Sequence, residues 1–322
     1  MFATQSSLRS GLAATWLAFA LTIVAACGDG GTTDPGGPPS GADGGTLTLA
    51  RSELAIDYPN DVVEFDLASG RSTLRFEGFD PHRVPTGETA YLAPLQGASD
   101  DVAVVVADAR NVPGAPVYVC AGFIHSVNRI CHTPRLSPNV RLVAFGTAAG
   151  GGSVCRDSYW GTYFADYVVV VDRNGDEASR FEGFYYPDWL PDGRLLMMGS
   201  PCRGGGVWVT DEALGTATRV DGEQISIPGS FPAVSPDGSE VLFVWSAQLW
   251  TLTLDGQGIL TQLTTFDEEV HSGAWSPDGT RVAALVLDRE VPVKQVLIFR
   301  PGDEQVSAVS VPFHPYGPVS WH

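Results

Sequence analysis

The chain has 322 residues, including 37 glycines and 23 prolines, and long runs of helix-forming residues are missing. This composition favours an all-β protein with many short strands joined by tight turns, and a closed all-β domain can hold this length. The formal net charge of −18 repels phosphate backbones; because no basic patch offsets it, the composition argues against nucleic acid as a partner.

Residues 1–26 have the pattern of a signal peptide. Arg9 precedes an apolar run, Gly11 to Ala26, which is too short at about 1.5 Å per residue to cross a hydrocarbon core of roughly 30 Å. The run ends in Val-Ala-Ala-Cys27, which resembles a bacterial lipobox. That resemblance implies cleavage before Cys27 and a lipid on its sulfur. The alternative is an ordinary secretory signal followed by a chance cysteine.

Residues 27–46 are predicted to be the lipidated cysteine and a flexible tether. The segment 28–45 is rich in glycine and proline and has almost nothing apolar to bury. Gly28 stands where an inner-membrane retention aspartate would follow the lipidated cysteine, so the expected destination is the outer membrane, on its periplasmic or surface side. The membrane is thus an expected partner through Cys27.

A tight-turn motif recurs between apolar strands of residues 47–322. The strongest copies are 231–238 (FPAVSPDG) and 272–279 (SGAWSPDG), where proline presets φ, aspartate hydrogen-bonds its own backbone and glycine accepts a positive φ. Weaker copies occur around the other turn prolines, and successive turn prolines are 53, 53, 45 and 41 residues apart. That spacing fits a four-stranded propeller blade. The turn prolines are Pro85, Pro138, Pro191, Pro236 and Pro277.

A second repeated unit is a strand that ends in a tight turn. Residues 61–79 and 167–184 both contain it and both end in RFEGF, and 248–256 repeats the strand and turn once more. Together with the Ser-Pro-Asp-Gly copies, these repeats resemble the WD40-like propeller repeats of the TolB family. The resemblance implies a propeller lipoprotein with a partner-binding role.

The two ends of the chain predict how the propeller closes. Residues 317–322 (GPVSWH) align with the strand before a turn, and residues 46–50 (TLTLA) are strand material without a preceding turn. One terminus therefore completes a blade begun by the other, which removes an exposed sheet edge. The predicted fold is a six-bladed β-propeller of four-stranded antiparallel blades over residues 47–322, closed by a blade shared between the N- and C-termini.

Four cysteines besides Cys27 predict two disulfides in an exported protein, and three pairings are possible. In the blade register, Cys120 and Cys131 flank one connection between blades, and Cys155 and Cys202 lie in equivalent loops of adjacent blades. The predicted pairs are Cys120–Cys131 and Cys155–Cys202. A zinc site is the rival interpretation, but the spacing lacks a CxxC pair.

One face of the predicted propeller gathers the longest connections. The segment 146–167 is far longer than a hairpin needs, and its aromatic residues suit a recognition surface. Neighbouring connections add carboxylates, histidines and tyrosines. The alternative is that these aromatics cap loops and the carboxylates only face solvent. The candidate binding-face residues are Asp80, His82, Tyr159, Trp160, Tyr163, Tyr185, Tyr186, Asp188, Glu268, Glu269, His271, His314 and Tyr316.

Motifs for catalysis or cofactors are absent from the sequence. GxSxG, HExxH, a Walker loop and a dinucleotide fingerprint do not occur, and the six histidines are scattered. Residues 172–176 (DRNGD) partly match a calcium loop but lack its later ligands, so a β-turn is the better interpretation. We therefore expect no cofactor and no metal.

The sequence leaves three functional hypotheses. The first is a monomeric, non-catalytic envelope lipoprotein whose propeller face binds a protein or a cell-wall component. The second is a hydrolase or lyase acting on a sugar or peptide at the central mouth, with carboxylates and histidines such as Asp188 and His271. The third is a purely structural surface lipoprotein.

Overall fold

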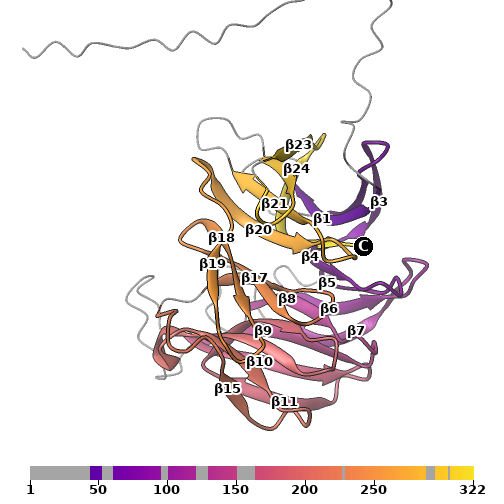
Figure 1. The fold of residues 1–322 in the computed structure, drawn as a ribbon. Helices are drawn as coiled ribbons and strands as arrows, with labels where there is room; N and C mark the ends of the chain where they lie inside the picture. The colour runs from indigo at the N-terminus through magenta and orange to yellow at the C-terminus, as the bar shows by residue number, and fades with distance from the viewer. Residues whose placement is uncertain are drawn as a thin grey trace, which may run out of the picture. The chain divides into compact units, whose positions relative to one another are not determined.

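A computed structural model describes residues 44–52, 61–95, 101–120, 130–150, 164–226, 229–287, 294–303 and 305–322. These residues form six four-stranded antiparallel sheets in a ring, a six-bladed β-propeller (Figure 1). The predicted signal peptide and nearly all of the predicted tether lie outside the described residues, so both stay predictions.

Each blade is described from its inner to its outer strand. Blade 1 contains β24 (His314–Trp321), β1 (Thr46–Ser52), β2 (Asp61–Asp66) and β3 (Arg71–Glu77). Blade 2 contains β4 (Phe79–Arg83), β5 (Thr89–Pro94), β6 (Val102–Ala107) and β7 (Pro113–Cys120). Blade 3 contains β8 (Ile130–Leu136), β9 (Leu142–Gly150), β10 (Phe164–Asp172) and β11 (Glu177–Glu182).

The other three blades follow the same order. Blade 4 contains β12 (Phe184–Trp189), β13 (Leu195–Gly199), β14 (Val207–Thr210) and β15 (Ala217–Arg219), with the short 3-10 helix η1 (Pro201–Arg203) between β13 and β14. Blade 5 contains β16 (Ser230–Val234), β17 (Glu240–Trp245), β18 (Gln248–Thr253) and β19 (Leu260–Gln262). Blade 6 contains β20 (Glu269–Trp275), β21 (Val282–Leu287), β22 (Lys294–Phe299) and β23 (Val306–Ser310).

The shared blade closes the ring as the sequence predicts. Strand β24 pairs with β1, with Leu47 opposite Trp321 and Thr48 opposite Ser320, so the two ends of the colour scale meet in one sheet (Figure 1). Each inner strand also contacts the next, from β24 through β4, β8, β12, β16 and β20 back to β24. The predicted five internal blades and one shared blade are confirmed.

The core consists of apolar clusters between neighbouring blades. In β13, Leu195 and Met197 pack toward blade 3, whereas Leu196 and Met198 pack toward blade 5. Middle strands therefore bury both faces and are apolar throughout, because successive side chains of a strand point to opposite sides. Outer strands such as β3 are mostly exposed and polar. This difference in burial explains why the middle strands are the most strongly apolar segments of the sequence.

In blades 2 to 6, the repeated turn motif joins the inner strand to the second strand. In blade 6, Asp278 Oδ1 accepts hydrogen bonds from Ser276 Oγ at 2.6 Å and from the Thr280 amide at 3.0 Å, and Gly279 has a φ of 70°. These hydrogen bonds hold the pKa of Asp278 at about 2. The aspartate is therefore ionised at neutral pH and closes the turn.

Candidate functional site

The inner strands that line the central channel carry a repeated backbone kink. In four blades, a non-glycine residue with positive φ precedes a proline: Asp80 (50°), Thr133 (47°), Tyr186 (49°) and Phe231 (51°); in blade 1, Gly317 (72°) precedes a proline in the same way. Each inner strand also shifts register against its neighbour around this position. Such β-bulges change the direction in which side chains point. Positive φ is uncommon outside glycine, so the packing of the surrounding ring must hold the backbone in this conformation.

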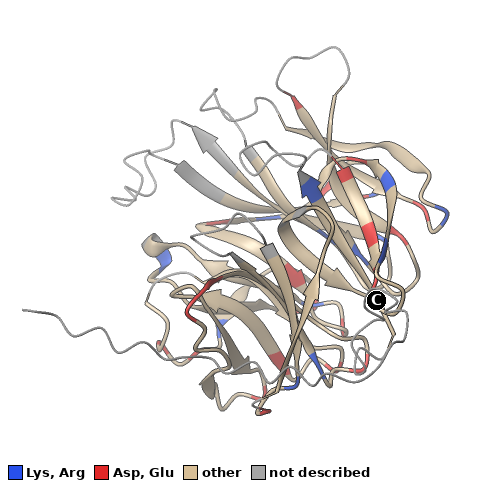
Figure 2. Cartoon of the chain, turned by 90° about the horizontal axis from the view of Figure 1, so that it is seen from above, with Lys and Arg blue, Asp and Glu red and all other residues tan. Residues whose placement is uncertain are grey.

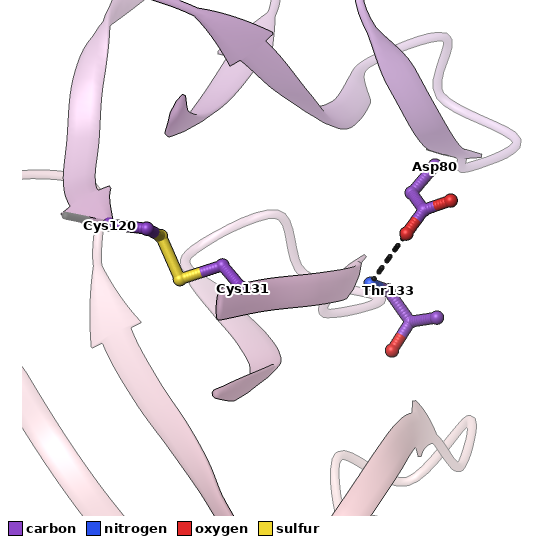
Figure 3. The surroundings of a disulfide bond; sticks show 4 residues. All are labelled: Asp80, Cys120, Cys131 and Thr133. Atoms are coloured by element: carbon purple, nitrogen blue, oxygen red, sulfur yellow. Dashed lines mark hydrogen bonds between the residues drawn. A yellow bond between two sulfur atoms is a disulfide. The ribbon is translucent and has the colours of Figure 1, made fainter. Parts of the chain in front are cut away.

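Two side chains of β4 bind the backbone of the next blade. Asp80 Oδ2 accepts a hydrogen bond from the Thr133 amide at 3.1 Å (Figure 3), and His82 Nδ1 accepts one from the Leu136 amide at 3.1 Å. Because an accepting Nδ1 carries no proton, the neutral His82 ring has its proton on Nε2. Burial, with a contribution from the Arg135 charge, holds the pKa of His82 well below its ordinary value.

Arg135 of β8 is the cation at the centre of the channel wall. Arg135 is only 4% exposed, and its Nε lies 3.6 Å from Asp188 Oδ1 of β12. Asp188 Oδ2 in turn accepts a hydrogen bond from the Val234 amide of β16 at 2.7 Å. Burial raises the pKa of both Asp80 and Asp188, and the Arg135 cation opposes this rise. The cluster thus links blades 2 to 5.

A row of ring contacts connects the inner strands of blades 3 to 6. Ring centroids are 5.2 Å apart for His132 and Tyr186, 5.2 Å for Tyr186 and Phe231, and 5.1 Å for Phe231 and His271. These residues come from four successive inner strands. Burial lowers the pKa of His132 to about 4, so this ring is neutral at physiological pH.

A cavity of about 430 Å³ opens at the turn-bearing end of the channel. All five turn prolines line it and are exposed, so they form its rim. Trp189, Trp275 and Trp321 also line it, and His82, Arg135 and Asp188 contribute the polar wall. The cavity is therefore mainly apolar, with a few convergent polar groups, as ligand sites usually are.

The closing blade contributes a second ionic cluster near this mouth. Buried Glu64 of β2 forms ion pairs with Arg75 and with Arg83, the latter at 3.1 Å between Glu64 Oε1 and Arg83 Nη1. Arg83 and His322 line the cavity, and His322 Nε2 lies 2.9 Å from Thr48 Oγ1. Acidic residues elsewhere are spread over several blades and turns (Figure 2).

The structure places most predicted face residues in inner strands, where the sequence had suggested connections. Asp80, His82, Tyr185, Tyr186, Asp188, Glu269, His271, His314 and Tyr316 all belong to strands, and Glu268 remains in a connection. In β4 and β12, the kink before proline allows the strand to continue through residues that resemble a turn. Of these residues, His82 and Asp188 line the cavity, which opens at the end opposite the predicted loop face.

The predicted long loop is shorter than 146–167. Residues 146–150 and 164–167 belong to β9 and β10, where Gly146 pairs with Val168 and Gly150 with Phe164. Tyr159, Trp160 and Tyr163 lie outside the described residues, so their predicted role in binding stays a prediction.

The predicted disulfide between Cys120 and Cys131 is present, with the Cα atoms 5.9 Å apart. It joins the outer strand of blade 2 to the inner strand of blade 3, two residues before Thr133 (Figure 3). Cys155 lies outside the described residues, as does the side chain of Cys202, which is in η1; their pairing stays a prediction. In the described part of the chain, no cluster of three potential metal ligands occurs and no helix is long and apolar enough to cross a membrane.

Arg135 is the functional candidate that sequence reasoning missed. A usable signal was present: Pro81, Pro134, Pro187 and Pro232 each lie four residues before a turn proline. This spacing marks the inner strands, and the residue after each of these prolines is His82, Arg135, Asp188 or Ala233. Three of these four residues form the polar wall of the cavity.

Neither a protein family model nor a curated protein matches this chain. Solved structures match in fold. TolB from Acinetobacter baumannii superposes with a TM-score of 0.62 at 13% identity, over 86% of this chain and 66% of that chain. A putative TolB from Agrobacterium tumefaciens superposes with a TM-score of 0.55 at 17% identity, over 85% and 91%. The propeller is TolB-like.

This TolB-like propeller spans just under two thirds of the Acinetobacter protein's length. An oligogalacturonate lyase in complex with manganese also matches, with a TM-score of 0.51 at 13% identity, over 82% of this chain and 78% of that chain. The fold therefore occurs in enzymes as well, and the choice between binding and catalysis depends on the site itself.

Proposed function

We propose that this chain is an exported envelope lipoprotein, anchored through Cys27, whose propeller binds a protein or cell-wall partner without catalysing a reaction. The observation that carries this proposal is the cavity of about 430 Å³ at the turn-bearing end of the channel. Its rigid rim of prolines and its tryptophans offer apolar contact at a low entropic cost, which suits recognition.

The hydrogen bonds of the polar wall favour binding over catalysis. Asp188 accepts from the Val234 amide and His82 from the Leu136 amide, so both side chains serve the backbone of a neighbouring blade. The His271 ring contacts the Phe231 ring at a tilt of 44°, with the ring centroids 5.1 Å apart. A general acid–base mechanism needs titratable groups placed to exchange protons with a substrate and with each other, and the described contacts of these residues are structural.

The chain enters the propeller beside the cavity. The Thr46 amide donates to the His322 carbonyl at 2.9 Å, and His322 lines the cavity. Residues 28–45 would reach about 60 Å if fully extended and roughly 20–25 Å on average as a flexible chain. With a lipid on Cys27, the mouth would stay near the membrane, so the proposed partner is one that is accessible there.

Two experiments test this proposal. Cys27→Ser should abolish metabolic labelling with palmitate and release the protein from the membrane fraction; labelling that persists would contradict the anchor. For the binding end, a photoreactive amino acid is placed in intact cells at Pro236 on the rim, at Ser246 in a loop at the opposite end, or at Glu177 on outer strand β11. We expect a discrete adduct from Pro236 only. An adduct from Ser246 only, or none from any position, would contradict the proposed binding end.

A further inference from the structure

Arg135 is buried beside the cavity with most of its donors unused. A guanidinium group has five N–H donors. Among the described residues, its one hydrogen bond is from Nη1 to the carbonyl oxygen of Pro134, at 3.2 Å. The contact with Asp188 is an ion pair whose nearest atoms, Nε and Oδ1, are 3.6 Å apart, and within the part of the chain that the structure describes no hydrogen bond joins the guanidinium to a carboxylate. No Arg135 nitrogen is among the buried side-chain atoms without a hydrogen-bond partner, so these donors open onto the cavity, where a ligand can accept their hydrogen bonds.

The neighbouring carboxylates do not fill this role. Asp80 Oδ2 accepts from the Thr133 amide and Asp188 Oδ2 from the Val234 amide, so backbone hydrogen bonds fix both carboxylates. Asp80 is not part of the cavity lining, whereas Arg135 is. The two carboxylates thus hold the guanidinium in place by charge, and neither accepts a described hydrogen bond from it.

His82 adds a second donor to the same wall. Its Nδ1 accepts from the Leu136 amide, so the neutral ring offers only an Nε2–H to a ligand. Arg135 and His82 come from adjacent inner strands, and both line the cavity. Within a chain of net charge −18, the cavity lining thus contains two arginine cations, Arg83 and Arg135, against one carboxylate, Asp188. His82 adds a neutral donor.

We propose that Arg135 and His82 form a binding site for a carboxylate carried by an extended peptide. A charge-assisted Arg–carboxylate contact is the strong, geometrically specific interaction that such a wall provides. The rest of the lining is mostly proline, tryptophan and aliphatic side chains, which suit an extended peptide backbone with small apolar residues. An oligosaccharide would need many more polar partners for its hydroxyl groups. This inference rests on the proposed function, because it names the ligand class of the same cavity.

The test uses the purified full-length chain in detergent and pools of random tetrapeptides that are acetylated at the N-terminus and, except in the third pool, amidated at the C-terminus. One pool contains a fixed glutamate, a matched pool has glutamine instead, and a third has a free C-terminal carboxylate. Trigalacturonate is tested in parallel as a carboxylate on a sugar. We expect the acidic pools to be retained about tenfold or more over the glutamine pool, and millimolar acetate to reduce that retention. The preferred acidic pool then distinguishes a side-chain carboxylate from a terminal one.

Variants locate the effect at Arg135. Arg135→Gln should abolish the acidic preference, Arg135→Lys should keep part of it, and Arg110→Gln, at an exposed turn, should leave it unchanged. Equal retention of the acidic and glutamine pools by the unaltered protein would overturn the carboxylate site, and this result does not depend on whether Arg135→Gln folds. It would leave the proposed function intact, because the cross-linking experiment tests that function separately. Binding of trigalacturonate without any peptide would overturn the peptide assignment.

Discussion

At the scale of single residues, the turn motif shows which atoms the fold needs. Asp278 accepts three hydrogen bonds through one oxygen, from Ser276 Oγ and from the amide and hydroxyl of Thr280. In blade 3, Asn139 accepts from Ser137 Oγ and from the Arg141 amide at the equivalent turn. A side-chain oxygen, not a negative charge, is the shared requirement.

This comparison predicts unequal effects of two substitutions. Asp278→Asn should change the free energy of unfolding by less than about 0.5 kcal/mol, whereas Asp278→Ala should lower it by about 1 kcal/mol, because only alanine removes the acceptor. Urea denaturation of both variants checks this. Equal losses for asparagine and alanine would mean that the charge of Asp278 dominates.

His132 predicts a loss of stability in mild acid. Its pKa is about 4 in the folded protein and 6.5 as the ordinary value, so between these pH values the unfolded chain binds a proton that the folded chain does not. Stability from this group is therefore complete above pH 6.5 and falls as the pH drops toward 4.

His132→Phe isolates this contribution, since phenylalanine can keep the ring contact with Tyr186. Between pH 7 and pH 5, unfolding free energy should fall by roughly 1–2 kcal/mol more in the unaltered protein than in the variant. The difference between the two proteins removes the contributions of Asp80 and Asp188, whose raised pKa acts in the opposite direction. Parallel pH profiles would refute the assignment.

At the scale of secondary-structure elements, the Cys120–Cys131 disulfide covalently joins blades 2 and 3, which belong to separate hydrogen-bonded sheets. Cys120 ends β7 and Cys131 follows the start of β8, and the pair closes a connection of sequence separation 11. A disulfide that closes a loop of this length restricts the unfolded chain, and this restriction stabilises the native state by about 2–4 kcal/mol.

Removing this disulfide should have a defined thermal effect. Cys120→Ala with Cys131→Ala should lower the melting temperature by several degrees, and a reductant should lower that of the unaltered protein by at least as much, because it also cleaves the predicted Cys155–Cys202 pair. Alkylation of the denatured, unreduced protein measures the second predicted pair: modification of neither Cys155 nor Cys202 would support their disulfide, and modification of both would exclude it. An unchanged melting temperature in the double variant would contradict the stabilising role of Cys120–Cys131.

The middle strands could be predicted from the sequence more easily than the inner strands and the candidate site that these inner strands carry. Middle strands such as β13 bury both faces, so their apolar runs were plain in the sequence. Inner strands mix charged, aromatic and proline residues because they line a channel, and residues such as Tyr186 and Asp188 therefore resembled connections. The contact between Arg135 and Asp188 joins separate blades, and no local pattern reports such a contact.

At the scale of the whole propeller, repeat spacing and the matching chain ends were enough to predict six blades and the shared one. The spacing between copies of a repeated motif gives the length of one blade, and closure of the propeller ring is expected because it covers the exposed sheet edges. The cavity could not be derived in this way, because its volume depends on how six inner strands converge. It also depends on β24, since Trp321 and His322 form part of its wall.

The most direct test of this account is therefore a cross-link across the closing strands. Thr48 and Ser320 are directly opposed in the β1–β24 pair, so Thr48→Cys with Ser320→Cys should form a disulfide, which peptide mapping by mass spectrometry identifies. The control is Thr48→Cys with Ser307→Cys on β23. Efficient formation of only the 48–320 cross-link is the predicted result. Its absence, or equal formation of the control, would contradict the closed ring and the cavity that depends on it.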